Sequence, residues 1–113
     1  ITPATTGNKV LVQINTSLLI SSGGYVGYLT IFANHSGSMA NITNNVGYAN
    51  IHTAVTGGED LLVGVTVTDL HSPGTSGSAI RYEMYCRSSS SSLVTHWSQN
   101  AALSTIILQE IRA

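Results

Sequence analysis

The sequence predicts an all-β domain, a single antiparallel β-sandwich or jelly roll of about seven or eight strands that spans residues 1–113. Apolar and polar residues alternate along several short segments, which is the pattern of strands with one buried face. Gly, Ser, Asn and Thr interrupt every stretch, so no long amphipathic helix fits the chain. The 113 residues, 42% of them apolar, suffice for one domain with one hydrophobic core.

Turn residues divide the chain into its predicted strands. The strands are expected at residues 9–21, 26–34, 48–56, 61–70, 79–87, 93–98 and 104–111. Between them lie a Ser-Ser-Gly-Gly turn at 21–24, a polar, Asn-rich loop at 35–47 and a serine tract at 88–92. Residues 69–77 are expected to form a turn-rich corner, in which Pro fixes its backbone angle φ and Gly permits a positive φ.

The alternation assigns faces to the strands. Residues 61–70 set Val against Thr and Gly, and residues 79–87 set apolar side chains against Arg, Glu and Tyr. One face of each of these strands is therefore expected in the core. Residues 26–34 carry apolar side chains on both faces and are expected to be buried on both sides. Core positions are expected for three aromatic residues: Tyr28, Phe32 and Tyr82.

The last ten residues, 104–113, form an apolar, β-branched run that stops almost where the chain stops. Chain termini fray unless a sheet or a docking surface holds them. We therefore expect residues 104–111 to be an inner strand, with the C-terminus built into the fold. Glu110 in this strand is expected to form a salt bridge with one of three arginines: Arg81, Arg87 or Arg112.

Charged residues make up only 8% of the chain, against roughly 25% in typical soluble domains. A neutral β-protein with polar turns would have this composition, and so would an obligate oligomer, because interface cores are depleted of charge. We favour the oligomer. The net charge of −1 provides no field for nucleic acid or anionic lipid. No apolar run reaches the roughly 18 residues of a membrane span, so no membrane insertion is expected.

No motif in the sequence indicates catalysis, a metal or a cofactor. The four histidines lack metal-ligand spacing, although a three-fold axis could still gather three copies of one histidine around an ion. Asp69, His71 and Ser72 lie within four residues, whereas the members of a hydrolytic triad converge from separate segments. Cys86, the single cysteine, permits no disulfide within one chain and is expected to be a buried thiol. We therefore expect no catalytic residues, no metal site, no cofactor and no enzymatic activity.

Aromatic residues near loops are the side chains of this sequence best suited to form a ligand-binding surface. Tyr48 and Trp97 are the candidate aromatic contacts, and Asn41, Asn44 and Asn45 supply polar groups. Ring stacking combined with side-chain hydrogen bonds suits the recognition of sugars. These five residues form the predicted ligand-binding site.

Three stretches resemble a β-domain that occurs in structural proteins of tailed phages and other viruses. Residues 1–12, ITPATTGNKVLV, are similar to its ITP…SKILV opening. Residues 69–82, DLHSPGTSGSAIRY, resemble its D.PGT…YxV corner and strand, and residues 100–111 resemble its closing N…STLTLMEI strand. The resemblance implies a trimeric jelly roll, similar in architecture to tumour-necrosis-factor heads.

The resemblance also implies a function in the virion. The first expectation is the distal receptor-binding or trimer-capping domain of a phage tail fibre or tailspike, a homotrimer that binds a host cell-surface glycan or protein. The second is a capsid decoration (cement) trimer on the capsid exterior, whose partner is the capsid protein. The third is a secreted adhesion or signalling head, for which the three Asn-x-Ser/Thr sequons would matter. A chain that opens at Ile1 without Met fits an excised fibre domain better than a complete cement protein.

Overall fold

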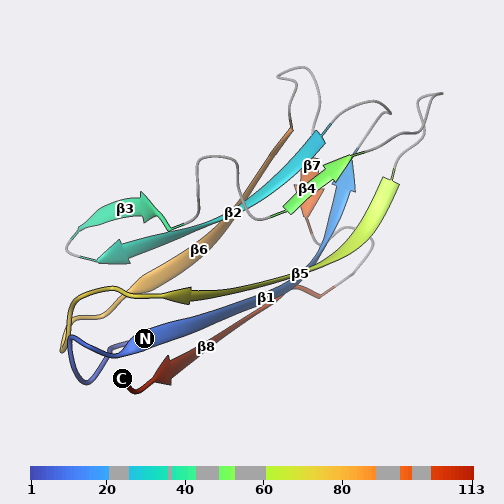
Figure 1. Ribbon diagram of the computed structural model, residues 1–113. Helices are drawn as coiled ribbons and strands as arrows, with labels where there is room; N and C mark the ends of the chain where they lie inside the picture. The colour runs from blue at the N-terminus through green and yellow to red at the C-terminus, as the bar shows by residue number, and fades with distance from the viewer. Residues whose placement is uncertain (21–25, 36, 43–48, 53–60, 89–94, 98–102) are drawn as a thin grey trace.

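In the computed structural model the described part of the chain forms eight β-strands (Figure 1). The structure describes residues 1–20, 26–35, 37–42, 49–52, 61–88, 95–97 and 103–113. The strands are β1 (Lys9–Ile20), β2 (Val26–His35), β3 (Ser38–Asn41), β4 (Ala49–His52), β5 (Leu61–His71), β6 (Arg81–Ser88), β7 (Thr95–Trp97) and β8 (Thr105–Ile111). Within these ranges there is no helix, and hence none long and apolar enough to cross a membrane. The all-β prediction is confirmed, and every predicted strand overlaps an observed one.

β1 is the central strand of the first sheet. β5 pairs with it along nearly its full length on one side, from Val10↔His71 to Ile20↔Leu61. β8 and β7 share the other side, where β8 pairs with the first half of β1 and β7 with its last three residues. All three pairings are antiparallel.

β2 is the central strand of the second sheet. β6 pairs with it on one side, from Gly27↔Ser88 to Asn34↔Arg81. On the other side β4 pairs with the beginning of β2, and β3 pairs with its end. These pairings are antiparallel too, so both sheets have one long neighbour on one side of the central strand and two shorter ones on the other.

The prediction of a long loop at residues 35–47 is wrong for its first part, which contains the end of β2 and the strand β3. His35 ends β2, and β3 returns along it as a short antiparallel strand. Gly37 lies between them with a φ of 87°, an angle that glycine adopts without the steric cost of a Cβ atom. The sequence Ser-Met-Ala-Asn forms this strand without a strict alternation of polar and apolar residues, because pairing uses backbone groups, which every residue type but proline supplies in full. The predicted turn at 21–24, and most of the serine tract, lie outside the described residues.

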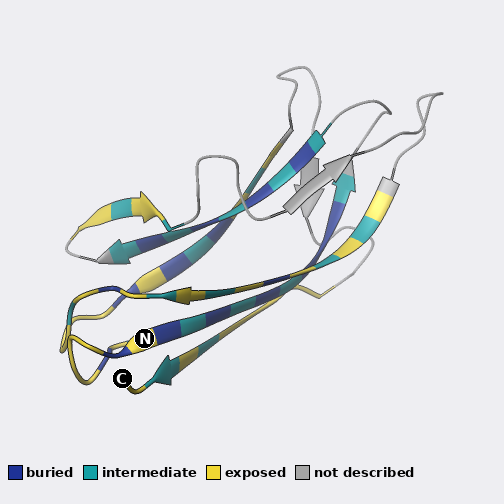
Figure 2. Cartoon of the chain, viewed as in Figure 1, coloured by how far each residue is buried: buried dark blue, intermediate teal, exposed yellow. Residues whose placement is uncertain are grey.

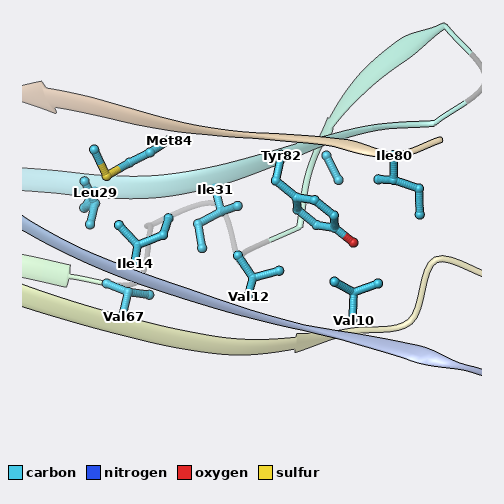
Figure 3. Close-up of a cluster of buried hydrophobic side chains, with 10 residues drawn as sticks. Val10, Val12, Ile14, Leu29, Ile31, Val67, Ile80, Tyr82 and Met84 are labelled. Atoms are coloured by element: carbon cyan, nitrogen blue, oxygen red, sulfur yellow. The ribbon is translucent and has the colours of Figure 1, made fainter. Parts of the chain in front are cut away.

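The two sheets face each other across one hydrophobic core (Figure 3). Its members come from both sheets: Val10, Val12 and Ile14 of β1, Val67 of β5, Leu29, Ile31 and Ala33 of β2, Tyr82 and Met84 of β6, and Ile80 just before β6. Full burial of one such Val, Leu or Ile side chain contributes roughly 1.5–3 kcal/mol. The alternation predicted these inward faces of β1, β5 and β6 correctly. Two antiparallel sheets with one shared core are consistent with a β-sandwich.

β2 is buried on one face only (Figure 2). Its inward side chains are fully buried, whereas Tyr28 and Phe32 are partly exposed on the outward face. The predictions that this strand is buried on both sides, and that these two rings are in the core, are therefore wrong. Each sheet of a two-layer fold has one face in the core and one face outward, so apolar residues on the second face remain at the surface. Tyr82 is buried as predicted.

β8 forms an edge of the first sheet. Among the described strands it pairs with β1 alone, so the prediction of an inner strand is wrong. Leu108 packs against the core, but Ile106 and Ile107 remain 43% and 51% exposed. The apolar run therefore covers the core through Leu108 and leaves apolar surface exposed on both faces, at Ile106 on the face of Leu108 and at Ile107 on the outward face.

Both termini are tied into the same end of the molecule (Figure 1). The Ile1 ammonium donates a hydrogen bond to the carbonyl oxygen of Ile80 over 3.1 Å, and the Ile80 amide donates to the Ile1 carbonyl over 2.8 Å. The Ala113 amide donates to Oδ1 of Asn8 over 3.3 Å. The expectation that the C-terminus is built into the fold is thus confirmed.

Glu110 fastens the N-terminal segment to β8. Its Oε1 accepts hydrogen bonds from the Ala4 amide and from Nδ2 of Asn8, both at 2.6 Å. The hydrogen bond from Asn8, followed by that from Ala4, lowers the pKa of Glu110 below its ordinary value. The expected salt bridge with an arginine is therefore replaced by hydrogen bonds to the first residues of the chain, which lie beside β8 only in the folded state.

Candidate functional site

The outward face of the β2–β6 sheet carries an array of aromatic and charged side chains, which we call the aromatic–arginine face. It comprises Tyr28, Thr30 and Phe32 of β2, Asn41 of β3, and Arg81, Glu83, Tyr85 and Arg87 of β6. These residues share one face because every second residue of a strand points to the same side and registered partners lie on the same side of a sheet.

Two cross-strand contacts join β2 to β6 on this face. Tyr28 and Arg87 are registered partners, and the guanidinium carbon lies over the tyrosine ring, 4.7 Å from its centroid. This is a cation–π contact. The rings of Phe32 and Tyr85 meet edge to face, with centroids 4.9 Å apart and an interplanar angle of 65°. The contacts hold three aromatic rings and one cation in fixed positions at the surface.

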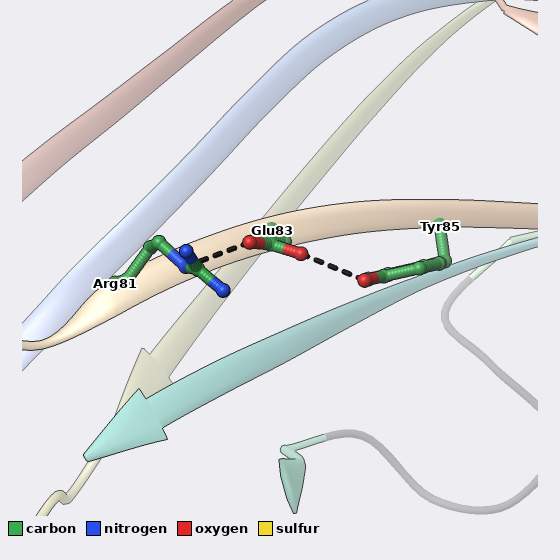
Figure 4. Close-up of polar contacts among 3 residues, drawn as sticks. All are labelled: Arg81, Glu83 and Tyr85. Atoms are coloured by element: carbon green, nitrogen blue, oxygen red, sulfur yellow. Dashed lines mark hydrogen bonds and ion pairs between the residues drawn. The ribbon is translucent and has the colours of Figure 1, made fainter. Parts of the chain in front are cut away.

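Glu83 links the remaining polar groups of the face (Figure 4). Its Oε1 lies 2.7 Å from Nε of Arg81, and its Oε2 accepts a hydrogen bond of 2.7 Å from the hydroxyl of Tyr85. That hydrogen bond, followed by the charge of the carboxylate, raises the pKa of Tyr85. Arg81 is thereby paired, whereas no carboxylate among the described residues pairs with Arg87. Counted over the described residues, the face thus carries a net charge of +1.

The structure brings one of the five predicted site residues to this face. Asn41 lies opposite Phe32 in register, and its Oδ1 accepts a hydrogen bond of 3.0 Å from the hydroxyl of Thr30. Trp97 belongs to the other sheet, where its backbone in β7 pairs with Leu18 of β1. Three predicted residues lie outside the described part of the chain: Asn44, Asn45 and Tyr48.

Sequence reasoning missed Tyr28, Tyr85 and Arg87 as parts of one site. The alternation in β6 placed Tyr85 and Arg87 outward, as observed. Strand order decides that β2 lies beside β6, and periodicity within one strand carries no information about its neighbour. To find this site from the sequence, one would have to know that β2, which carries Tyr28, pairs with β6, which carries Tyr85 and Arg87.

The outward face of the other sheet carries neutral side chains on β1, β5 and β8 with one exception, Lys9 at the start of β1, and we call it the neutral face. It comprises Leu11, Gln13 and Asn15 of β1, Leu62, Gly64, Thr66, Thr68 and Leu70 of β5, and Thr105, Ile107 and Gln109 of β8. A hydrogen-bonded row crosses it, from the Thr66 hydroxyl to Oδ1 of Asn15 (2.9 Å) and from Nδ2 of Asn15 to Oγ1 of Thr105 (3.5 Å). Three large apolar side chains are about half exposed: Leu62 (44%), Leu70 (47%) and Ile107 (51%).

His71 and Tyr82 form a structural pair between β5 and β6. Nδ1 of His71 lies 2.8 Å from the Tyr82 hydroxyl, and the two rings meet edge to face. Burial, and then the charge of Asp69, raises the pKa of Tyr82 to about 12, so its hydroxyl stays protonated. Burial likewise raises the pKa of the Cys86 thiol, the opposite of what activates a nucleophilic cysteine. Across the described ranges, no group of three or more His, Cys, Asp or Glu side chains is placed to hold a metal ion.

Comparison with known proteins found no match to this chain among protein-family models, curated proteins or solved structures. The two outward faces and the resemblance in the sequence are therefore the basis for assigning a function.

Proposed function

We propose that the chain is the distal receptor-binding or trimer-capping domain of a phage tail fibre or tailspike, a homotrimeric jelly roll of the virion. The contrast between the two outward faces is the observation that supports it best. The neutral face suits burial against other copies of the chain, and the aromatic–arginine face suits contact with a ligand in water. The resemblance of residues 1–12, 69–82 and 100–111 to the viral β-domain supports the virion context.

The neutral face supports self-association through its composition. Interface cores are depleted of charge, and burying an unpaired ion in one is costly. Leu62, Leu70 and Ile107 lie on a surface where contact with a second copy would bury apolar area, with one ion, Lys9 at the start of β1, to be kept in water at the rim of the contact. β8 is also an edge strand, and a ring of copies that closes after three members would shield such edges.

The aromatic–arginine face lies on the opposite sheet and would point outward from such a trimer. Three copies would present it three times to a host surface, where its ligand recurs. Repetition turns weak individual contacts into strong overall binding through a high effective concentration. This mode of action requires no catalytic group.

Ile107→Asp tests the self-association. It places a charge on the neutral face, and the expected product is a monomer or insoluble protein, because an interface cannot bury an unpaired carboxylate at low cost. Size-exclusion chromatography with light scattering measures the mass, and the unmodified chain is expected at three times the mass of one chain. Ser78→Asp adds the same charge at an exposed position after the corner and should remain trimeric. A stable monomer for the unmodified chain contradicts the proposal.

Adsorption to cells tests the receptor-binding role. The fluorescently labelled chain is mixed with a panel of bacterial strains, and we expect it to coat the surface of a subset of them. Assembled phage capsids serve as the second target. Binding to capsids together with binding to no strain would support the capsid decoration function instead.

A further inference from the structure

We propose that the aromatic–arginine face binds an acidic sugar, with the sugar ring on Tyr85 and the sugar carboxylate on Arg87. The inference rests on the proposed receptor-binding function and names its ligand class, a surface glycan that carries carboxylate groups. Three features of the face support it: a cation that pairs with no carboxylate of the described ranges, an exposed ring held in place, and the position of both on one face of β6.

Arg87 supplies the charge that would recognise a carboxylate. Glu83 compensates Arg81 at 2.7 Å, but no carboxylate among the described residues does the same for Arg87. The guanidinium lies over the Tyr28 ring, which orients it, with its carbon 4.7 Å from the centroid. Its N–H donors lie in the guanidinium plane, so a group held against a ring can still donate from its edge. That edge matches a carboxylate in a two-point hydrogen-bonded pair.

Tyr85 supplies a flat apolar surface for the sugar ring. It is 46% exposed, and two contacts hold it, the edge-to-face contact with Phe32 and the hydrogen bond to Glu83. A side chain that is already ordered loses little conformational entropy when a ligand stacks on it. Thr30, the registered partner of Tyr85, and Asn41 beyond it add neutral polar groups on the same face.

Tyr85 and Arg87 lie close enough on one face for one acidic oligosaccharide to contact both. They are two positions apart in β6, so both project from the same face with Cα atoms about 6.5–7 Å apart. The Tyr85 ring is held toward Glu83 and Phe32 and the Arg87 guanidinium lies over Tyr28, so the sugar ring on Tyr85 and the carboxylate on Arg87 belong to the same residue or to adjoining residues of the glycan. A neutral sugar could stack on Tyr85 but would leave Arg87 without an anionic partner. The face therefore favours the acidic sugar over its neutral counterpart.

Matched acidic and neutral probes test the proposal. The probes are oligosaccharides containing sialic acid or glucuronic acid, each paired with the same compound after reduction of its carboxyl group to an alcohol. Calorimetric titration into the full chain measures their affinities. At least one acidic probe is expected to bind about tenfold or more tightly than its reduced partner, since a charge-assisted contact is lost. Equal affinities within every pair, or no binding of any acidic probe, would overturn the proposal.

Three variants locate the contact. Arg87→Gln is expected to weaken binding of the acidic probe about tenfold and to leave the reduced probe unchanged. Tyr85→Ala should weaken both probes, because it removes the stacking surface. Arg112→Gln removes the same charge from an exposed position in the C-terminal segment and should change neither. Acidic-probe binding that survives Arg87→Gln would show that the site is elsewhere.

Cell adsorption and light scattering on the same preparations separate this proposal from the broader one. If the chain coats cells but binds no acidic probe, the ligand class is wrong and the receptor-binding role stands. If it coats no cell in the panel, the receptor-binding role is contradicted as well. Light scattering and circular dichroism show whether each variant keeps its assembly and fold.

Discussion

Glu110 accepts two hydrogen bonds of 2.6 Å, from Asn8 and from the backbone of Ala4. Both donors favour the ionised carboxylate, and together they lower its pKa in the folded state. A carboxylate whose pKa is lower in the folded than in the unfolded state contributes stability above its unfolded pKa, about 4.3 for glutamate. That contribution is lost as the pH falls through the folded-state value.

Glu110→Gln is therefore expected to make stability less dependent on pH. Urea unfolding at pH 7 and at pH 3 measures the free energy of unfolding at the two ends of the titration. The unmodified chain should lose more stability between them than the variant, because glutamine has no proton to take up. Equal losses in the two proteins would show that the hydrogen bonds from Asn8 and Ala4 contribute nothing to acid sensitivity.

At the scale of elements, the 69–77 corner turns through glycines with positive φ angles. Gly74 has a φ of 64°, and no heavy atom lies within 4 Å of the position that a Cβ would take. A side chain there would meet no obstacle, and its cost would arise only from the backbone angle. The sequence predicted a glycine with such freedom in this corner, and the structure confirms it.

Gly74→Ala is expected to lower the free energy of unfolding by about 1–2 kcal/mol. Gly7→Ala is the control, because the φ of Gly7 lies outside the positive range and a Cβ there meets only the Cβ of Ala113 at 3.5 Å, an ordinary van der Waals distance. It should be neutral or stabilise the protein by up to about 1 kcal/mol, since alanine restricts the unfolded chain more than glycine does. Chemical denaturation compares the two, and similar effects would argue against strain at Gly74.

At the scale of the whole molecule, stability depends on the core that the two sheets share. Ile14 lies in the middle of β1 with none of its surface exposed, among side chains from both sheets. Removing most of its side chain would leave a cavity between the layers, and a well-packed interior relaxes only partly into such a space.

Ile14→Ala is expected to cost about 2–5 kcal/mol. The control Ser78→Ala, at an exposed position, should remain within about 0.5 kcal/mol of the unmodified chain. Denaturation is measured at one fixed protein concentration, because self-association would otherwise shift the apparent stability. A small loss for Ile14→Ala would mean that the sheets pack loosely at this position.

The pattern of apolar and polar residues along the chain predicted most of the strands and most of their inward faces. Val12 and Ile14, for example, alternate with Gln13 and Asn15, and this pattern is local to one strand. It failed for residues 26–34, because hydrophobicity on both faces does not reveal which face the second sheet covers. It also failed for β3, whose pairing with β2 depends on backbone groups that leave no trace in side-chain polarity.

Which strands are neighbours follows from the folded arrangement alone, and the candidate site depends on it. Tyr28 meets Arg87 because β2 pairs with β6, and β8 lies at an edge because its only described neighbour is β1. Glu110 binds Asn8 across 102 positions of the chain. Such contacts depend on the order and register of distant strands, which the period-two pattern within each strand does not specify.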